Sequence, residues 1–101
     1  NMTRAFINPI ISDLIPVYLK RRDEDIVLLR QYIETGNFES IQRLGHKLQG
    51  NGSMYGFDPI TKLGCELEFS ALEKNMLKVR EHTQELSEYL SNVEICPEVE
   101  K

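Results

Sequence analysis

The chain has 101 residues, of which 41% are apolar and 28% are charged, so we expect one folded domain with a single hydrophobic core. The net charge of −4 argues against a nucleic-acid partner, because phosphate binding requires clustered lysine and arginine. No apolar run reaches the roughly 20 residues that a membrane-spanning helix needs, so membrane insertion is not expected.

Helical spacing of apolar residues begins early in the chain and continues almost to its end. The inner face of the first long helix is predicted to hold Ile15, Leu19, Ile26, Leu29 and Ile33. Ser12 or Asp13 can cap this helix, and Pro16 then lies in its first turn, where a missing N–H is tolerated. Gly36 is suited to a left-handed C-cap. Pro9 predicts a separate short helical segment before this helix.

Three further helices with short connections follow. The second begins near Phe38, and its predicted inner face holds Phe38, Ile41, Leu44, Gly45, Leu48, Gly52 and Tyr55. The third begins at Asp58-Pro59 and ends before Lys74-Asn75, with an inner face of Ile60, Leu63, Leu67 and Ala71. The fourth ends at Pro97 and buries Met76, Val79, Thr83, Leu86, Leu90 and Val93.

Strand signals are weak, because no long run alternates apolar and polar residues. The predicted fold class is therefore all-α, an antiparallel up-down four-helix bundle with a short N-terminal helical segment. We expect one domain over residues 2–96 and a frayed tail over residues 97–101.

The stretch GHKLQGNGSMYGF, from Gly45 to Phe57, places a histidine among several glycines. At about 100° per residue, His46 lies roughly 150° from the centre of the inner face and so points to solvent or to a groove edge. Helical side chains lean toward the N-terminus, so the residue four positions later would normally cover the ring. That residue is Gly50, which leaves the imidazole open to a large partner. Gly45 and Gly52 lie toward the core, where they allow a neighbouring helix to pack closely.

The segments LGHKLQGNGSMYGF and LGCELE resemble the histidine-containing phosphotransfer (Hpt) domain family. The family motif is His-x-Leu-Lys-Gly, followed by small residues, a further glycine and a helix that ends in a pair such as Leu-Glu. The matching positions of this chain are His46, Leu48, Gly50, Gly52-Ser53, Gly56 and Leu67-Glu68. The resemblance covers nearly the whole chain, and it implies the same helical bundle.

The resemblance implies that His46 accepts a phosphoryl group from a receiver-domain aspartate and passes it to another receiver. It also implies that Glu68, on the next helix, orients the His46 ring. The family usually has lysine three residues after the histidine, where this chain has Gln49, which can donate a hydrogen bond but brings no charge. Lys47 and Arg43 are the candidates to supply that charge to the phosphoryl group.

The sequence contains no Walker or kinase motif and no phosphate-cradling loop with lysine. We therefore predict a phosphoryl carrier, not an enzyme, with no cofactor of its own and with Mg²⁺ held by the receiver. The implied partners are response-regulator receiver domains and a hybrid sensor histidine kinase. Apolar residues that could dock such a partner are Ile10, Ile11, Leu14, Met54 and Tyr55.

Two other interpretations stay open at this point. One is a non-catalytic helical adaptor of the same fold, which binds receivers without phosphotransfer; Gln49 motivates it. The other is a metal- or haem-binding bundle that uses His46 with His82, Cys65 or a carboxylate, although no Glu-x-x-His pair supports it.

The remaining polar features have ordinary explanations. His82 is expected on the solvated surface, and so is the Lys20-Arg21-Arg22 cluster, which could also meet an acidic partner. Cys65 and Cys96 form no CxxC motif, so we expect reduced thiols in a cytoplasmic, monomeric protein.

Overall fold

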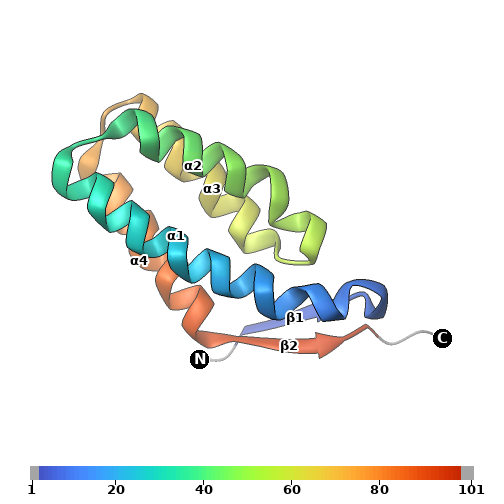
Figure 1. The fold of residues 1–101 in the computed structure, drawn as a ribbon. Helices are drawn as coiled ribbons and strands as arrows, with labels where there is room; N and C mark the ends of the chain where they lie inside the picture. The colour runs from blue at the N-terminus through green and yellow to red at the C-terminus, as the bar shows by residue number, and fades with distance from the viewer. Residues whose placement is uncertain (1–2, 99–101) are drawn as a thin grey trace.

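The computed structural model describes residues 3–98, which form an elongated helical bundle of 47 × 25 × 19 Å (Figure 1). The long helices are α1 (Ile15–Thr35), α2 (Phe38–Asn51), α3 (Asp58–Leu72) and α4 (Met76–Asn92). Short 3-10 helices, η1 (Pro9–Leu14) and η2 (Ser53–Tyr55), precede α1 and α3. The predicted four-helix bundle is confirmed, and η1 is the short helical segment expected at Pro9.

The helix boundaries agree only in part with the predicted caps. Gly36 has φ of 65°, and its N–H donates to the carbonyl oxygen of Ile33, as expected for a left-handed C-cap. Asn75 caps α4 by accepting a hydrogen bond from the Lys78 N–H. The cap predicted for α1 is absent, because α1 continues directly from η1 at Leu14, so that neither Ser12 nor Asp13 caps it.

The core follows the predicted inner faces of the four helices. Its fully buried members include Leu29, Ile41, Leu48, Phe57, Ile60, Leu67, Val79 and Leu86. The most extensive contact between two helices joins α2 and α3, which lie along one another in Figure 1. This pair carries the site, because His46 lies on α2 and Glu68 on α3.

Glycines let α2 and α3 approach one another at backbone distance. A Cβ at Gly45 would lie 2.7 Å from the Glu68 backbone nitrogen and 2.7 Å from the Gly64 carbonyl oxygen. A Cβ at Gly52 would lie 2.5 Å from the backbone nitrogen of Thr61. The close packing predicted at Gly45 and Gly52 is confirmed, while the matching role of Gly64 on α3 was not predicted from the sequence.

Two strands, β1 (Thr3–Ile7) and β2 (Val93–Pro97), form a parallel two-stranded sheet that was not predicted. The prediction that the fourth helix continues to Pro97 is wrong, because α4 ends at Asn92. The prediction of a frayed tail is also wrong for its first two residues. Pro97 pairs with Ile7, and the Glu98 N–H donates to the Ile7 carbonyl oxygen; residues 99–101 lie outside the described part.

Each strand is too short to be recognised from the pattern of the sequence. The alternation in β1 spans five residues, with Ala5 and Ile7 buried against the bundle and Phe6 exposed. In β2 the apolar residues continue the helical spacing of α4, so periodicity alone extends the helix. Pairing between strands that are far apart in sequence decides the conformation there.

One member of the Lys20-Arg21-Arg22 cluster is buried, which corrects the prediction of a solvated face. Arg22 is 3% exposed, and its Nε lies 2.9 Å from Oδ2 of Asp25, which is 5% exposed. The guanidinium carbon lies 4.5 Å from the centre of the Tyr18 ring. Burial raises the pKa of Asp25, and the positive charge of Arg22 opposes that rise.

Candidate functional site

His46 lies on the outer face of α2, and 75% of its side chain is exposed, in agreement with the helical wheel. The position one turn later is open, because a Cβ at Gly50 would meet no atom within 4 Å. Gly50 therefore differs from Gly45, whose missing side chain makes room for another helix. The space beside the imidazole is therefore open to solvent.

Glu68 reaches His46 from the neighbouring helix. Oε2 of Glu68 lies 3.0 Å from Nδ1 of His46, and the glutamate side chain is only 19% exposed. A carboxylate only accepts hydrogen bonds, so Nδ1 is the nitrogen that carries the proton of the neutral ring. The free lone pair of the neutral ring is then on Nε2. The predicted position of Glu68 beside His46 is thus what the structure shows.

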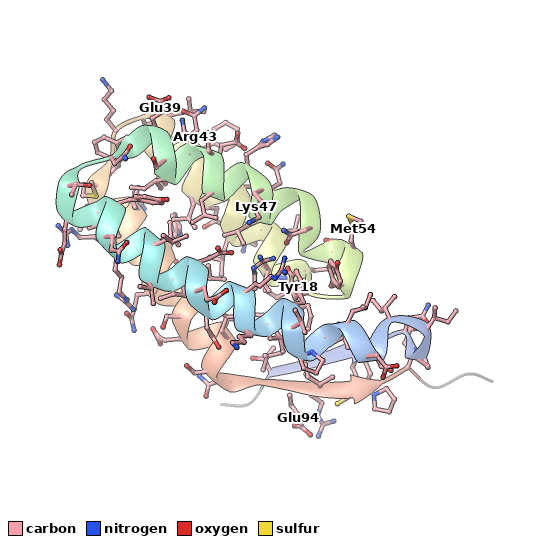
Figure 2. All side chains as sticks on the ribbon, in the orientation of Figure 1. Tyr18, Glu39, Arg43, Lys47, Met54 and Glu94 are labelled. Atoms are coloured by element: carbon pink, nitrogen blue, oxygen red, sulfur yellow. The ribbon has the colours of Figure 1, made fainter. Side chains whose placement is uncertain are left out.

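A surface hollow at this pair is lined by Gln42, Arg43, His46 and Glu68. The guanidinium of Arg43 lies 2.7 Å from Oε1 of Glu39, and Figure 2 shows these two side chains together near the start of α2. Arg43 therefore lines the hollow that holds His46, with its guanidinium paired to Glu39.

Lys47 lies elsewhere on α2. It lines two hollows, one with Tyr18 and Asn51 and the other with Asp25 and Arg43. Figure 2 labels Lys47 on the side of α2 that faces α1. Gln49 is exposed one turn beyond His46, and its backbone nitrogen packs against α3, 2.5 Å from where a Cβ of Gly64 would lie. Of the two cations considered from the sequence, Arg43 is the one placed beside His46.

Comparison with protein families agrees with this geometry. A family model described as the Hpt domain matches residues 13–95, which include all four long helices. The chain belongs to the Hpt domain family. Hpt domains are phosphocarriers of two-component signalling that interact with receiver domains. No curated protein and no solved structure matches the chain. Among the described residues, no helix is long and apolar enough to cross a membrane.

An aromatic stack fixes the segment that follows the histidine helix of this Hpt domain. The Tyr18 hydroxyl donates to Oδ1 of Asn51 over 2.7 Å, and its ring stacks on Tyr55 and Phe57 at centroid distances of 4.2 and 5.6 Å. Burial raises the pKa of the Tyr18 phenol. Sequence reasoning missed Tyr18, although its spacing of three residues from Ile15 placed it on the inner face.

The apolar residues expected to dock a partner are divided between surface and core. Ile10, Leu14 and Met54 are exposed by 88%, 53% and 74%. Ile11 and Tyr55 instead pack against the core. Val17, one turn after Leu14 and 58% exposed, was not predicted.

His82 is not on the solvated surface, which corrects the prediction. Its side chain is 14% exposed, and its Nδ1 lies 2.9 Å from Oε2 of Glu66 and 3.0 Å from Oε1 of Glu85. The Hpt fold thus brings His46 together with Glu68 and brings His82 together with two other carboxylates. This arrangement gives no support to a metal or haem centre shared by His46 and His82. Both cysteines, Cys65 and Cys96, are free thiols, as predicted.

Proposed function

We propose that this Hpt domain is a phosphorelay intermediate, in which Nε2 of His46 takes a phosphoryl group from the aspartate of one receiver domain and delivers it to another. The observation that carries the proposal is an exposed imidazole held at Nδ1 by Glu68. Exposure gives a receiver access to the ring, and the hydrogen bond leaves Nε2 as the free nucleophile.

Transfer of the phosphoryl group from the first receiver to His46 is a single displacement at phosphorus. The Nε2 lone pair attacks phosphorus as the aspartyl P–O bond breaks, and the receiver carboxylate leaves with that electron pair. The proton stays on Nδ1, so the phosphorylated ring carries a positive charge. The Glu68 carboxylate, 3.0 Å from Nδ1, stabilises this cation. Transfer to the second receiver is the same displacement in reverse.

In this proposal the receiver supplies most of the groups that phosphoryl transfer requires. Phosphoryl transfer depends on positioning and on neutralisation of the phosphoryl oxygens. We assign the receiver its aspartate and Mg²⁺, and we assign this chain the nucleophile together with Arg43, the cation at the His46 hollow. Gln49 can donate a hydrogen bond to the phosphoryl group, but it adds no charge.

The charge assignment has a matched test. Arg43→Gln should shorten the lifetime of the phosphohistidine, whereas Lys47→Gln should leave it unchanged, because Lys47 faces α1. Both substitutions remove one positive charge from an exposed position of α2. Equal lifetimes in the two variants would show that Arg43 does not contact the phosphoryl group.

Exposed apolar residues near the start of α1 and after α2 suit a receiver as the docking partner. Leu14, Val17 and Met54 are all more than half exposed. Leu14 and Val17 line the same hollow as Tyr55 and Lys47, on the α1 side of α2. Burial of such apolar residues would stabilise a complex with a receiver without fixing its orientation.

The proposal is tested by transfer of labelled phosphate from a panel of phosphorylated receiver domains. Wild type and His82→Gln should take up label that is acid-labile and base-stable, and His46→Gln should take up none. Binding of a receiver by wild type without transfer would instead support the non-catalytic adaptor, which is motivated by Gln49 at the position where the family usually has lysine.

A further inference from the structure

We propose that Glu66, His82 and Glu85 form a binding site for one divalent transition-metal ion, with Zn²⁺ the best fit, at the contact between α3 and α4. Glu66 comes from α3, and the other two residues lie three positions apart on α4. One ligand atom from each residue lies within 4.8 Å of the other two. The site is independent of the phosphorelay function.

The spacing of the donor atoms suits a metal ion. Nδ1 of His82 lies 2.9 Å from Oε2 of Glu66 and 3.0 Å from Oε1 of Glu85. Zinc binds histidine nitrogen and carboxylate oxygen at about 2.0–2.2 Å, so neighbouring ligands around one ion lie roughly 3 Å apart. The imidazole and both carboxylates can therefore reach a common centre with small side-chain movements.

The two carboxylates of the cluster give it negative charge that a bound divalent cation would offset. Two carboxylates, which only accept hydrogen bonds, converge on one ring nitrogen that has at most one proton to donate. Lys62 offsets part of the negative charge, since its Nζ lies 3.9 Å from Oε1 of Glu66. A divalent cation would satisfy both carboxylates and the nitrogen lone pair at once.

The donor set indicates the class of metal. Mg²⁺ and Ca²⁺ prefer ligands that are all oxygen, whereas a mixed set with imidazole nitrogen suits zinc and its neighbours. The side chain of His82 is 14% exposed and that of Glu66 33%, while that of Glu85 is 57% exposed. Water can therefore reach the ion from the Glu85 side and complete its coordination.

This site differs from the pair at the phosphoacceptor. His46 meets one carboxylate and is 75% exposed, whereas His82 meets two and is largely buried. Glu66 and Glu68 are two residues apart on α3, so their side chains point about 200° apart around the helix. A metal at His82 would tie α3 to α4 and leave the His46 face uncovered.

The test is a calorimetric titration of the metal-free chain, without a histidine tag, with ZnCl2 and separately with MgCl2. We expect wild type to bind one Zn²⁺ and to prefer it to Mg²⁺. Glu85→Gln and His82→Gln should each weaken zinc binding at least tenfold, since loss of a mere hydrogen-bond partner of a metal ligand costs about 10–100-fold. His46→Gln is the matched control, because it removes the other His–Glu contact between helices, and it should bind zinc as wild type does.

Thermal unfolding gives a second readout. Zinc that binds only the folded chain raises its Tm, so at one zinc concentration Tm should rise in wild type and in His46→Gln and should rise less in Glu85→Gln. Glu85 is exposed enough for that variant to fold. Absence of stoichiometric zinc binding by wild type would overturn the proposal. Zinc binding that His46→Gln abolishes and His82→Gln retains would overturn it as well.

Discussion

The two histidines of this chain make similar contacts in opposite surroundings. Each places Nδ1 about 3 Å from a glutamate on a neighbouring helix, but His46 is 75% exposed and His82 is 14% exposed. His46 meets one carboxylate, and His82 meets a second from its own helix. A His–Glu contact between helices therefore occurs twice in this molecule, and the proposed function assigns the phosphoryl group to only one of the two histidines. On that proposal, the exposure of the His46 ring is what distinguishes it from His82.

The residue one turn later separates the two cases. Gly50 follows His46 at that spacing and leaves open space, whereas Leu86 follows His82 and is fully buried in the core. Variants at and around these positions test whether exposure of the ring separates His46 from His82.

The largest effect is expected from a bulky side chain at Gly50. Gly50→Leu should leave the fold intact, because the position faces open space, and should slow phosphotransfer to His46 about 100-fold by keeping the receiver aspartate out of place. Gly50→Ala is the control, with a single methyl group and a transfer rate near that of wild type. Rapid transfer to Gly50→Leu would refute the role of Gly50 in access to the ring.

The next effect concerns the glycines that position Glu68. Gly45→Ala should lower the free energy of unfolding by about 1–3 kcal/mol, because its Cβ would press on backbone atoms of α3. Gly50→Ala should raise it by roughly 0.5–1 kcal/mol, since alanine favours a helix and nothing is displaced. Urea denaturation measures both variants. Equal changes in the free energy of unfolding of the two variants would mean that α2 and α3 can move apart at Gly45 without loss of stability.

A smaller effect is expected when the carboxylate is removed from His46. Glu68→Ala should slow phosphorylation about tenfold, equivalent to roughly 1.4 kcal/mol of transition-state free energy. Glu68→Gln should lie between this variant and wild type, because its amide oxygen can still accept from Nδ1. Glu85→Gln, the corresponding change at His82, should transfer at the wild-type rate. Single-turnover kinetics with one phosphorylated receiver distinguish these outcomes.

The smallest effect is on stability. His82→Gln should lower the free energy of unfolding by about 1 kcal/mol through loss of a partly buried hydrogen bond between α3 and α4. His46→Gln should change it by less than about 0.5 kcal/mol, as is usual for an exposed residue. Denaturation in the presence of a chelator keeps metal binding out of the comparison. The two histidines would be energetically alike if both variants unfolded at the same denaturant concentration.

Sequence periodicity predicted the parts of this molecule that depend on local spacing. The four helices, the Gly36 cap and the exposure of His46 all follow from residues close together in the chain. What the sequence did not predict depends on contacts between distant segments. The pairing of β1 with β2 joins the two ends of the chain, and the burial of His82 depends on Glu66 of another helix.

Burial of charged residues was also beyond the reach of a helical wheel. Arg22 was expected on a solvated face because arginine is rarely buried, yet Asp25 and the Tyr18 ring make its burial possible. The position of Glu68 beside His46 was anticipated from the resemblance to the Hpt family, not from spacing. The glycine contacts between α2 and α3 explain in physical terms how that glutamate reaches the ring.

The most direct test is to determine which nitrogen is phosphorylated, by ¹H–¹⁵N and ³¹P NMR of the chain after transfer from a receiver. The hydrogen bond from Nδ1 to Glu68 predicts a single phosphoryl group on Nε2 of His46, with Nδ1 still protonated. A phosphoryl group on Nδ1 of His46, or on either nitrogen of His82, would contradict the assignment of Glu68 as the group that orients the phosphoacceptor.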